Sequence, residues 1–291
     1  MQLRLPSFRI PGHLLILVCS CMWSLGGVFI KVLTQSYHVD PRALACLRSA
    51  IAGLVLSWAL PGLAKAPRWK VLGAALAYTC VVAGFVLSTS GTSAANAIFL
   101  QYAYPLFVAV GAVFLFAEPL GRRTVLALAI GMTGIATILV FSWTPGEQVG
   151  VAYGFMTSFA FAAFALLSRS IRHDKPIALS SFYNLTAAAL LFLPAWGLLK
   201  VSGAALVLLA VMATFQLGIP YVLFIKGLRT VPTTDAALIT LVEPILNPVW
   251  VWLFIREVPH PSTIVGGVLI ILALLVRFAG RRKWEGMSGA G

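Results

Sequence analysis

The chain has 291 residues, of which 60% are hydrophobic and 10% are charged, whereas soluble domains usually carry about 25% charged residues. This composition excludes a soluble globular protein and a disordered chain. The four cysteines lie inside apolar stretches and are too few for a disulfide-stapled secreted fold, so we predict an integral membrane protein.

Apolar stretches long enough to span a bilayer follow one another along the chain. A helix needs about 20 apolar residues to cross a hydrocarbon core about 30 Å thick. Residues 71–117 carry no formal charge and are too many for one helix, so the polar cluster at 88–93 is predicted to divide them. Solid apolar blocks favour helices over the alternating strands of a barrel. The predicted all-α fold has ten transmembrane helices at 14–30, 43–60, 71–87, 94–117, 124–143, 148–168, 176–199, 201–225, 236–255 and 258–276.

Lys and Arg are distributed unevenly between the predicted loops. With a cytoplasmic N-terminus, sixteen of the 21 basic residues fall on the cytoplasmic side, four (Lys31, Arg42, Lys200 and Arg256) fall on the other side, and Arg48 lies within a span. Cytoplasmic loops keep an excess of basic residues, so both termini are predicted to be cytoplasmic. The net charge of +13 is spread over short loops without interleaved aromatic residues, which argues against nucleic acid as a partner and leaves membrane lipids as the surroundings.

Two proline and glutamate pairs indicate an internal repeat. Pro105 and Glu118 are spaced like Pro244 and Glu257, and the offset between the pairs is 139 residues. Spans one to five then correspond to spans six to ten, and because five is odd the two repeats insert with opposite orientations. Such inverted repeats are typical of secondary transporters that open alternately to the two sides of a membrane. The predicted domains are the two five-helix repeats, 1–143 and 144–291, the second with a short basic cytoplasmic tail.

Short motifs also follow one another in a recognisable order. They are Trp23, Ser24, Gly27, Phe29 and Lys31 in the first span, Asp40-Pro41 and Leu47-Arg48-Ser49 around the second, and the two Pro/Glu pairs. Over about residues 13–280 this order resembles the drug/metabolite transporter superfamily, in its EamA-type branch. The resemblance implies a bacterial inner-membrane exporter or permease for small metabolites, often amino acids, with a central cavity between the two halves.

Charged residues inside the spans are the strongest functional candidates. Arg48 lies well inside the second span, where a cation costs about 2.5–3.5 kcal/mol, so it is expected to face protein or a water-filled cavity and to have a partner. Glu243, directly before Pro244 in the ninth span, is the candidate for proton coupling. A lasting ion pair with Arg48, or bonds from backbone donors exposed at Pro244, is the alternative. Glu257 is expected to form an ion pair with its neighbour Arg256 or to make contacts that stabilise the loop.

The predicted substrate-binding residues come from several spans. Trp23, Gly27 and Lys31 share one face of the first helix, and an aromatic ring, a bare backbone and a cation in line suit an amphipathic zwitterion. Helix packing by Trp23 and Gly27, with Lys31 reaching the outer surface, is the alternative. A polar stripe on the ninth span and scattered aromatic residues, which also fit a core or lipid-facing role, complete the set. The set is Trp23, Gly27, Arg48, Tyr78, Gln101, Tyr104, Phe155, Phe159, Gln216, Tyr221, Thr240 and Asn247.

Motifs for enzymes, nucleotides and metals are missing from the sequence. No Gly-rich loop ending in Lys-Ser/Thr occurs, and the histidines lack a metal-ligand spacing, so no cofactor or metal is expected. The predicted function is non-enzymatic export of small amphipathic metabolites, amino acids or related compounds, by a monomer or homodimer. An importer or uncoupled facilitator is the main alternative, and a membrane-embedded enzyme built on Arg48 and Glu243 is a remote one.

Overall fold

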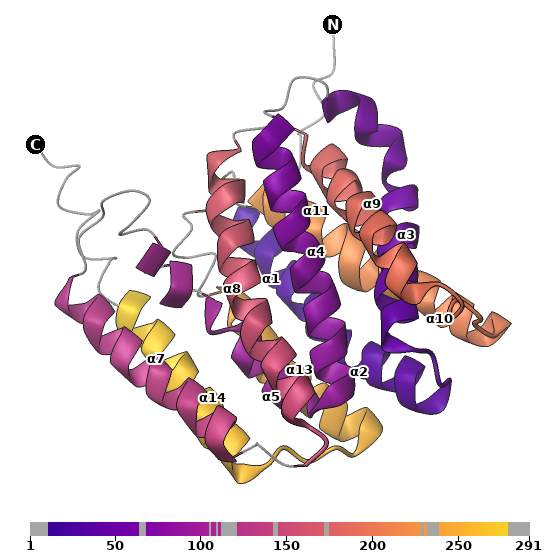
Figure 1. The fold of residues 1–291 in the computed structure, drawn as a ribbon. Coiled ribbons are helices and arrows are strands. Elements are labelled where there is room, and N and C mark those ends of the chain that lie inside the picture. The colour runs from indigo at the N-terminus through magenta and orange to yellow at the C-terminus, as the bar shows by residue number, and fades with distance from the viewer. Residues whose placement is uncertain are drawn as a thin grey trace, which may run out of the picture.

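The computed structural model describes residues 11–63, 68–104, 106–108, 110–111, 121–141, 145–171, 175–227, 230–231 and 239–278. All regular elements in these residues are helices, and no strand occurs among them (Figure 1). The α-helices are α1 Gly12–Trp23, α2 Gly26–Lys31, α3 Pro41–Val55, α4 Arg68–Gly91, α5 Ala94–Gln101, α7 Arg122–Phe141, α8 Gln148–Ser170, α9 Pro176–Ala195, α10 Gly203–Val211, α11 Ile219–Gly227, α13 Val242–Ile255 and α14 Pro261–Phe278. Two π-helical segments, η1 Val32–Ser36 and η3 Met212–Gly218, and one 3-10 segment, η2 Ser57–Leu63, join them.

The described helices make this a multi-pass membrane protein. Six continuous segments are long and apolar enough to cross a bilayer, and α3 with η2 gives a seventh if the two count as one span bent by 72°. The six are Gly12–Ser36, Trp69–Gly91, Arg122–Phe141, Gln148–Ser168, Pro176–Ala195 and Gly203–Gly227. Val242–Ile255 and Pro261–Val276 are shorter apolar helices. Pro105, Glu118 and the predicted domain boundary at 143/144 lie outside the described residues, and the count of ten stays a prediction.

Three predicted spans are less regular than the sequence suggested. The first is interrupted at Ser24 between α1 and α2 and ends in the π-helical η1. The second leaves its α-helix after Val55 and turns through η2, which contains Pro61. The eighth has the π-helical η3 between α10 and α11. Proline removes a backbone donor, and π-helical turns shift the register of the backbone hydrogen bonds, so each is a place where the helix face changes direction.

Helix starts follow local capping rules. The Asp40 side chain accepts a hydrogen bond from the Arg42 backbone N–H at 2.8 Å, and Pro41 occupies the first turn of α3. Ser93 caps α5 by accepting from the Asn96 N–H at 3.0 Å. These side chains satisfy backbone donors that have no partner within the helix.

The packing of helices repeats between the two halves. The helix α4 lies along α8, and α1 lies along α11 (Figure 1). These two contacts are equivalent, because α1 and α8 occupy the same position in their repeats, five predicted spans apart, and so do α4 and α11. Likewise α5 packs on α8, as α13 packs on α1 and α2. Two equivalent pairs, α3 with α9 and α7 with α14, pack on each other. This exchange pattern is what an internal two-repeat architecture requires.

Close glycine contacts occur at equivalent places in the two halves. A Cβ added to Gly12, at the start of α1, would lie 3.0 Å from the Gly227 carbonyl oxygen at the end of α11. A Cβ added to Gly150, at the start of α8, would lie 2.3 Å from the carbonyl carbon of Gly91 at the end of α4. Gly91 lies beside the residue whose carbonyl accepts a bond from Lys31, at the other end of the first span from Gly12. The two contacts therefore lie at opposite ends of the bundle, which fits halves of opposite orientation.

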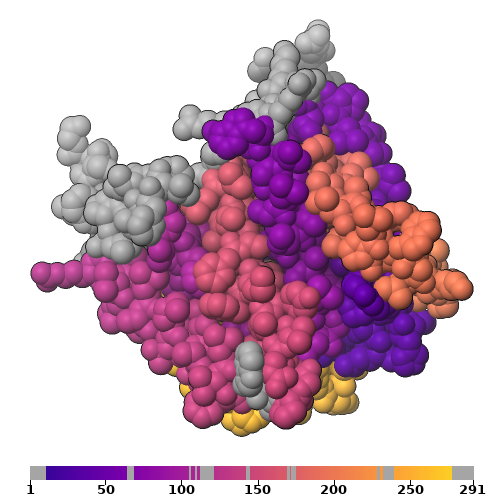
Figure 2. Space-filling model, in the orientation of Figure 1, coloured from indigo at the N-terminus to yellow at the C-terminus, as the bar shows by residue number. Residues whose placement is uncertain are grey.

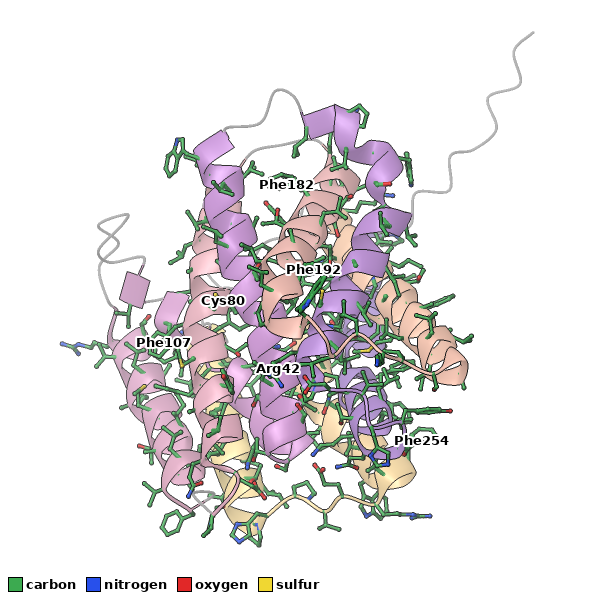
Figure 3. All side chains as sticks on the ribbon, turned by 45° about the vertical axis from the view of Figure 1, so that its right-hand side comes forward. Arg42, Cys80, Phe107, Phe182, Phe192 and Phe254 are labelled. Carbon is green, nitrogen blue, oxygen red and sulfur yellow. The ribbon has the colours of Figure 1, made fainter. Side chains whose placement is uncertain are left out.

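The sides of the bundle are apolar. Figure 2 shows α7, α8, α4 and α9 next to one another across one face of the molecule. Phe192 and Phe254 are 42% and 65% exposed, and they are labelled with the exposed Cys80 in Figure 3. Lipid solvates such side chains, so the exposed rings need no protein partner. The polar residues described below lie inside the bundle.

Candidate functional site

A cavity of about 40 Å³ lies inside the bundle where helices of both halves meet. Its polar lining residues are Trp23, Arg48, Gln101, Gln216, Tyr221 and Glu243. Its apolar lining residues are Val81, Val82, Phe85, Phe161 and Leu217. We call it the central cavity. All six polar residues belong to the predicted substrate-binding or proton-coupling set, so the structure brings residues of five predicted spans together at one place.

Two interrupted helices meet at the central cavity. In the fourth predicted span α5 ends at Gln101, and a turn follows at Tyr102. In the ninth span a turn at Leu241 precedes α13, which begins at Val242 and has Pro244 in its first turn. The turns at 102 and 241 are separated by the repeat offset of 139 residues, and α5 packs against α13. Broken helices at the contact of two repeats are where transporters of this architecture bind solutes and ions.

Arg48 is a buried cation without a carboxylate partner among the described residues. It is 2% exposed, and its Nη2 donates a hydrogen bond to the Val82 carbonyl at 2.7 Å. Its Nε has no hydrogen-bond partner in the described part of the chain. The salt bridges found among described residues join Lys31 to Glu257 and Arg42 to Asp40. The Nε donor of this cavity-lining guanidinium thus lacks an acceptor among the described residues, which is costly unless water or a ligand accepts from it.

Glu243 contacts a tyrosine that sequence reasoning missed. Its Oε2 lies 2.7 Å from the Tyr102 hydroxyl, which is also 2.8 Å from the Thr240 carbonyl oxygen. The hydroxyl has one proton and donates it to one of the two. Glu243 is 5% exposed and forms no ion pair with Arg48, although both line the central cavity. Two signals in the sequence point to Tyr102: it follows Gln101 directly, and it lies at the repeat offset from Leu241, just before the proline in each half.

Two side-chain amides flank the interruption in the first span. A Cβ on Gly26 would lie 2.7 Å from Gln216 Nε2, and a Cβ on Gly27 would lie 2.7 Å from Asn247 Oδ1. Gln216 Nε2 donates to the Trp23 carbonyl at 3.3 Å, while its Oε1 has no partner among the described residues. Both polar atoms of the fully buried Asn247 also lack one there. Buried amides of this kind normally bind water or a ligand. Gly27 and Asn247 therefore lie beside the polar groups of the central cavity.

The remaining predicted residues lie around the cavity or away from it. The Tyr78 hydroxyl donates to Asn184 Oδ1 at 3.0 Å, and its ring packs edge-on against Tyr221 at 5.1 Å. Tyr104 packs on Phe161, with ring centroids 4.2 Å apart. Both tyrosines therefore support lining residues. Thr240 contributes its carbonyl to Tyr102 as described above.

Phe155 and Phe159 do not line the central cavity. Phe159 is 47% exposed and stacks on Phe107 at 4.0 Å, and Phe155 packs edge-on against Phe159 at 5.0 Å. Phe161 of the same helix lines the cavity instead. Residues two apart in an α-helix are rotated by about 200° relative to each other, so the side chains of residues 159 and 161 point in nearly opposite directions. Phenylalanines are spread around the sixth span, and its sequence does not single out the one that faces the cavity.

An ion pair joins the two halves at one end of the bundle. Lys31 Nζ lies 2.8 Å from Glu257 Oε2 and donates to the Thr92 carbonyl at 2.8 Å. Glu257 Oε1 accepts from the Ala94 backbone N–H at 2.7 Å. Lys31 is buried, so it does not reach the outer surface, and Glu257 contacts Lys31 where the sequence suggested Arg256. The cation sits at the C-terminal end of α4 and the anion at the N-terminal end of α5, where helix dipoles favour each charge.

A second cavity, of about 380 Å³, opens at this end of the molecule. We call it the turn cavity because the turn between α4 and α5 forms part of its wall. It is lined by Lys31, Ser90–Ser93, Asn96, Phe141, Glu147, Glu257, Val258 and His260. Glu147 Oε2 accepts from the Thr92 hydroxyl at 2.7 Å. No three His, Cys, Asp or Glu side chains come together as metal ligands anywhere in the described part of the chain.

Two proteins of similar sequence are transporters by name. A protein from Archaeoglobus fulgidus called "Uncharacterized transporter" is 26% identical over 250 residues, which cover 85% of this chain and 90% of that protein. "Uncharacterized transporter YwfM" from Bacillus subtilis is 31% identical over 178 residues, or 57% of each chain. A solved crystal structure aligns with a TM-score of 0.66 and 16% identity over 94% of this chain and 98% of that one, which shows a shared fold.

The family comparison agrees with the repeat seen in the packing. The model of the EamA-like transporter family matches twice, at residues 10–140 and again at 148–278. These two matches fall on the two halves that share the same pattern of helix packing, and together they cover most of the chain. The chain therefore belongs to the EamA-like transporter family, within the drug/metabolite transporter superfamily that its motifs resemble.

Proposed function

We propose that this transporter exports small amphipathic metabolites, amino acids or related compounds, across the bacterial inner membrane by alternating access. The observation that carries the proposal is the central cavity. There both halves place polar groups that have no hydrogen-bond partner in the described part of the chain, around two interrupted helices. The proposed topology has ten spans, with both termini cytoplasmic and Lys31 on the outer side. The protein works as a monomer or homodimer, and lipids surround it.

Arg48 is the proposed site for an anionic group of the substrate. Its donors at the cavity lack a carboxylate partner among the described residues, so a substrate carboxylate would supply the missing charge. Phe85 and Phe161 provide apolar walls for the rest of the substrate, and Gln101 and Gln216 provide oxygens for donors such as an ammonium group. A zwitterion with an apolar side chain satisfies all of these groups together.

The size of the central cavity supports alternating access. Sites for small ligands usually enclose about 300–1,000 Å³. The central cavity of about 40 Å³ is too small for a metabolite, so it must widen for transport. The two halves pack through paired equivalent helices, α3 with α9 and α7 with α14, and these pairs are the proposed surfaces of movement.

Glu243 is the proposed carrier of a coupled proton. It is buried, it faces the same cavity as Arg48, and its contact with Tyr102 is a hydrogen bond that either protonation state can share. A carboxylate without a fixed cation can exchange a proton for a substrate ammonium group during the cycle. Purified protein in liposomes with an imposed pH gradient tests this. Wild type is expected to drive uphill substrate movement, and Glu243→Gln is expected to allow downhill movement alone.

Export is tested by the extracellular metabolite profile of cells that overproduce the protein. We expect defined amino acids or related compounds to accumulate outside cells with wild type, and not outside cells with Arg48→Gln at the same membrane level. Arg42→Gln is the matched control, since Arg42 is an exposed arginine outside the cavity. If wild type leaves the profile of an empty-vector strain unchanged, export is refuted and uptake becomes the function to test.

A further inference from the structure

We propose that the turn cavity is a second solute site, which takes a small molecule with a protonated amine and a short apolar group. Its volume of about 380 Å³ lies in the range of small-molecule sites, whereas the central cavity of about 40 Å³ has room for a few water molecules. In this conformation the turn cavity is thus the larger of the two spaces and the one that fits a metabolite. It is separate from the central cavity, with which it shares no lining residue.

The charges of Lys31 and Glu257 are already used within the protein. The Lys31 ammonium is bound by Glu257 Oε2 and by the Thr92 carbonyl. The second oxygen of Glu257, Oε1, accepts a hydrogen bond from the Ala94 N–H at 2.7 Å. Each ion has a charged partner and a helix end of complementary sign, so neither attracts a further ion strongly. A carboxylate ligand would have to displace Glu257 to reach Lys31.

Glu147 is the charge at this cavity that remains uncompensated. Its Oε2 accepts the Thr92 hydroxyl at 2.7 Å, and no cation pairs with it among the described residues. A carboxylate has about four acceptor sites, so a single hydroxyl leaves most of them available. The described lining residues therefore offer one negative charge without a partner, which selects a cation. An ammonium group matches it in charge and in hydrogen-bond donors.

Apolar side chains at the cavity select the other end of the ligand. Phe141 and Val258 line it and are 64% and 72% exposed. A ligand that covers them removes apolar surface from water, which favours binding. A ligand that meets both features carries an amine and an apolar group in one small molecule, as phenethylamine does.

Binding to the purified full-length protein in lipid nanodiscs tests the proposal. By isothermal titration calorimetry, phenethylamine is expected to bind and phenylacetate, which has a carboxylate in place of the amine, is expected not to. Glu147→Gln should weaken phenethylamine binding at least tenfold, because the glutamine oxygen still accepts the Thr92 hydroxyl while the charge is gone. Glu243→Gln, in the central cavity, should leave the affinity within twofold of wild type.

Several outcomes would overturn the second site. Equal binding of phenylacetate would remove the selectivity for amines, and loss of binding in Glu243→Gln with full binding in Glu147→Gln would place the ligand in the central cavity. A labelling experiment covers the case in which Glu147→Gln does not fold. Val258→Cys, made in a Cys21→Ser/Cys80→Ser background that removes the exposed native thiols, should react with a maleimide several-fold more slowly when phenethylamine is present. An unchanged rate would refute occupancy of the turn cavity.

Discussion

The Tyr102 hydroxyl lies 2.7 Å from Glu243 Oε2, and this contact joins the interrupted helix of one half to its equivalent in the other. Both residues are buried, at 3% and 5% exposure. The Thr240 carbonyl, 2.8 Å away, competes for the same hydroxyl proton. The hydroxyl therefore has two acceptors, and movement of either interrupted helix changes which of them it reaches.

Tyr102→Phe is expected to destabilise the protein and to impair transport. A hydrogen bond to a charged group contributes about 1.5–3 kcal/mol and a neutral one about 1 kcal/mol. If Glu243 is ionised, Tyr102→Phe should therefore cost the larger amount and Glu243→Gln should reduce that cost. A double-mutant cycle of unfolding free energies, measured by SDS titration in mixed micelles, gives the coupling directly. A coupling energy near zero would show that the two residues do not act together.

The buried charges Arg48 and Glu243 could be predicted from the sequence because a charged side chain within a membrane span has few favourable positions. A charged side chain facing lipid is costly, so Arg48 and Glu243 had to point inward, and the helical period carried Asn247 with Glu243. Tyr102 was missed because tyrosine is compatible with a core, a cavity and a lipid interface alike. The partner predicted for Glu257 was wrong for a different reason: Lys31 is distant in sequence, and tertiary packing brings it closer than any local pattern indicates.

Glu257→Gln is expected to destabilise the protein by about 3 kcal/mol. It leaves the Lys31 ammonium, whose side chain is 6% exposed, without a counter-charge, and breaking a buried pair typically costs about 3–5 kcal/mol. The lower end applies because the Glu257 side chain is 21% exposed. Arg42→Gln is the matched control: the Arg42 side chain is 53% exposed, and exposed ion pairs contribute little to stability because water screens them.

The Lys31→Gln/Glu257→Gln double variant completes this comparison. It removes both charges, so it should be more stable than Glu257→Gln alone. The transport rate should rise in the double variant if the ion pair has to open during the cycle. A double variant that is less stable than Glu257→Gln would show that Lys31 stabilises the protein independently of the carboxylate.

Asp40 predicts a stability change at acidic pH. The side-chain hydrogen bond from Arg42 lowers the pKa of the Asp40 carboxyl below its ordinary value of 3.8, and the backbone N–H of Arg42 adds to this. A lowered folded-state pKa means that the stabilisation is complete above pH 3.8 and is lost as the pH falls through the folded-state value. Asp40→Ala should therefore cost about 1 kcal/mol at pH 7, as for other N-caps, and the difference from wild type should shrink as the pH falls through the folded-state pKa. Asp40→Asn, which keeps the cap, should cost less than Asp40→Ala at pH 7. Thermal unfolding across this range measures both, and a gap that persists at low pH contradicts the assignment.

Gly150→Ala is expected to be the most damaging of three glycine substitutions. Its Cβ would lie 2.3 Å from the Gly91 backbone carbon, and backbone at the contact of α8 and α4 cannot move aside without separating the helices. Overpacking of this kind costs about 1–3 kcal/mol or more. A Cβ on Gly27 would lie 2.7 Å from Asn247 Oδ1 and 2.9 Å from Val251 Cγ2. Both are side-chain atoms and can shift more easily than backbone, so Gly27→Ala should cost less stability than Gly150→Ala while transport falls. Gly203→Ala has nothing within 4 Å and is the control. Expression level, melting temperature and transport rate separate the three, and a Gly27→Ala protein that transports normally would show that the contact with Asn247 is packing alone.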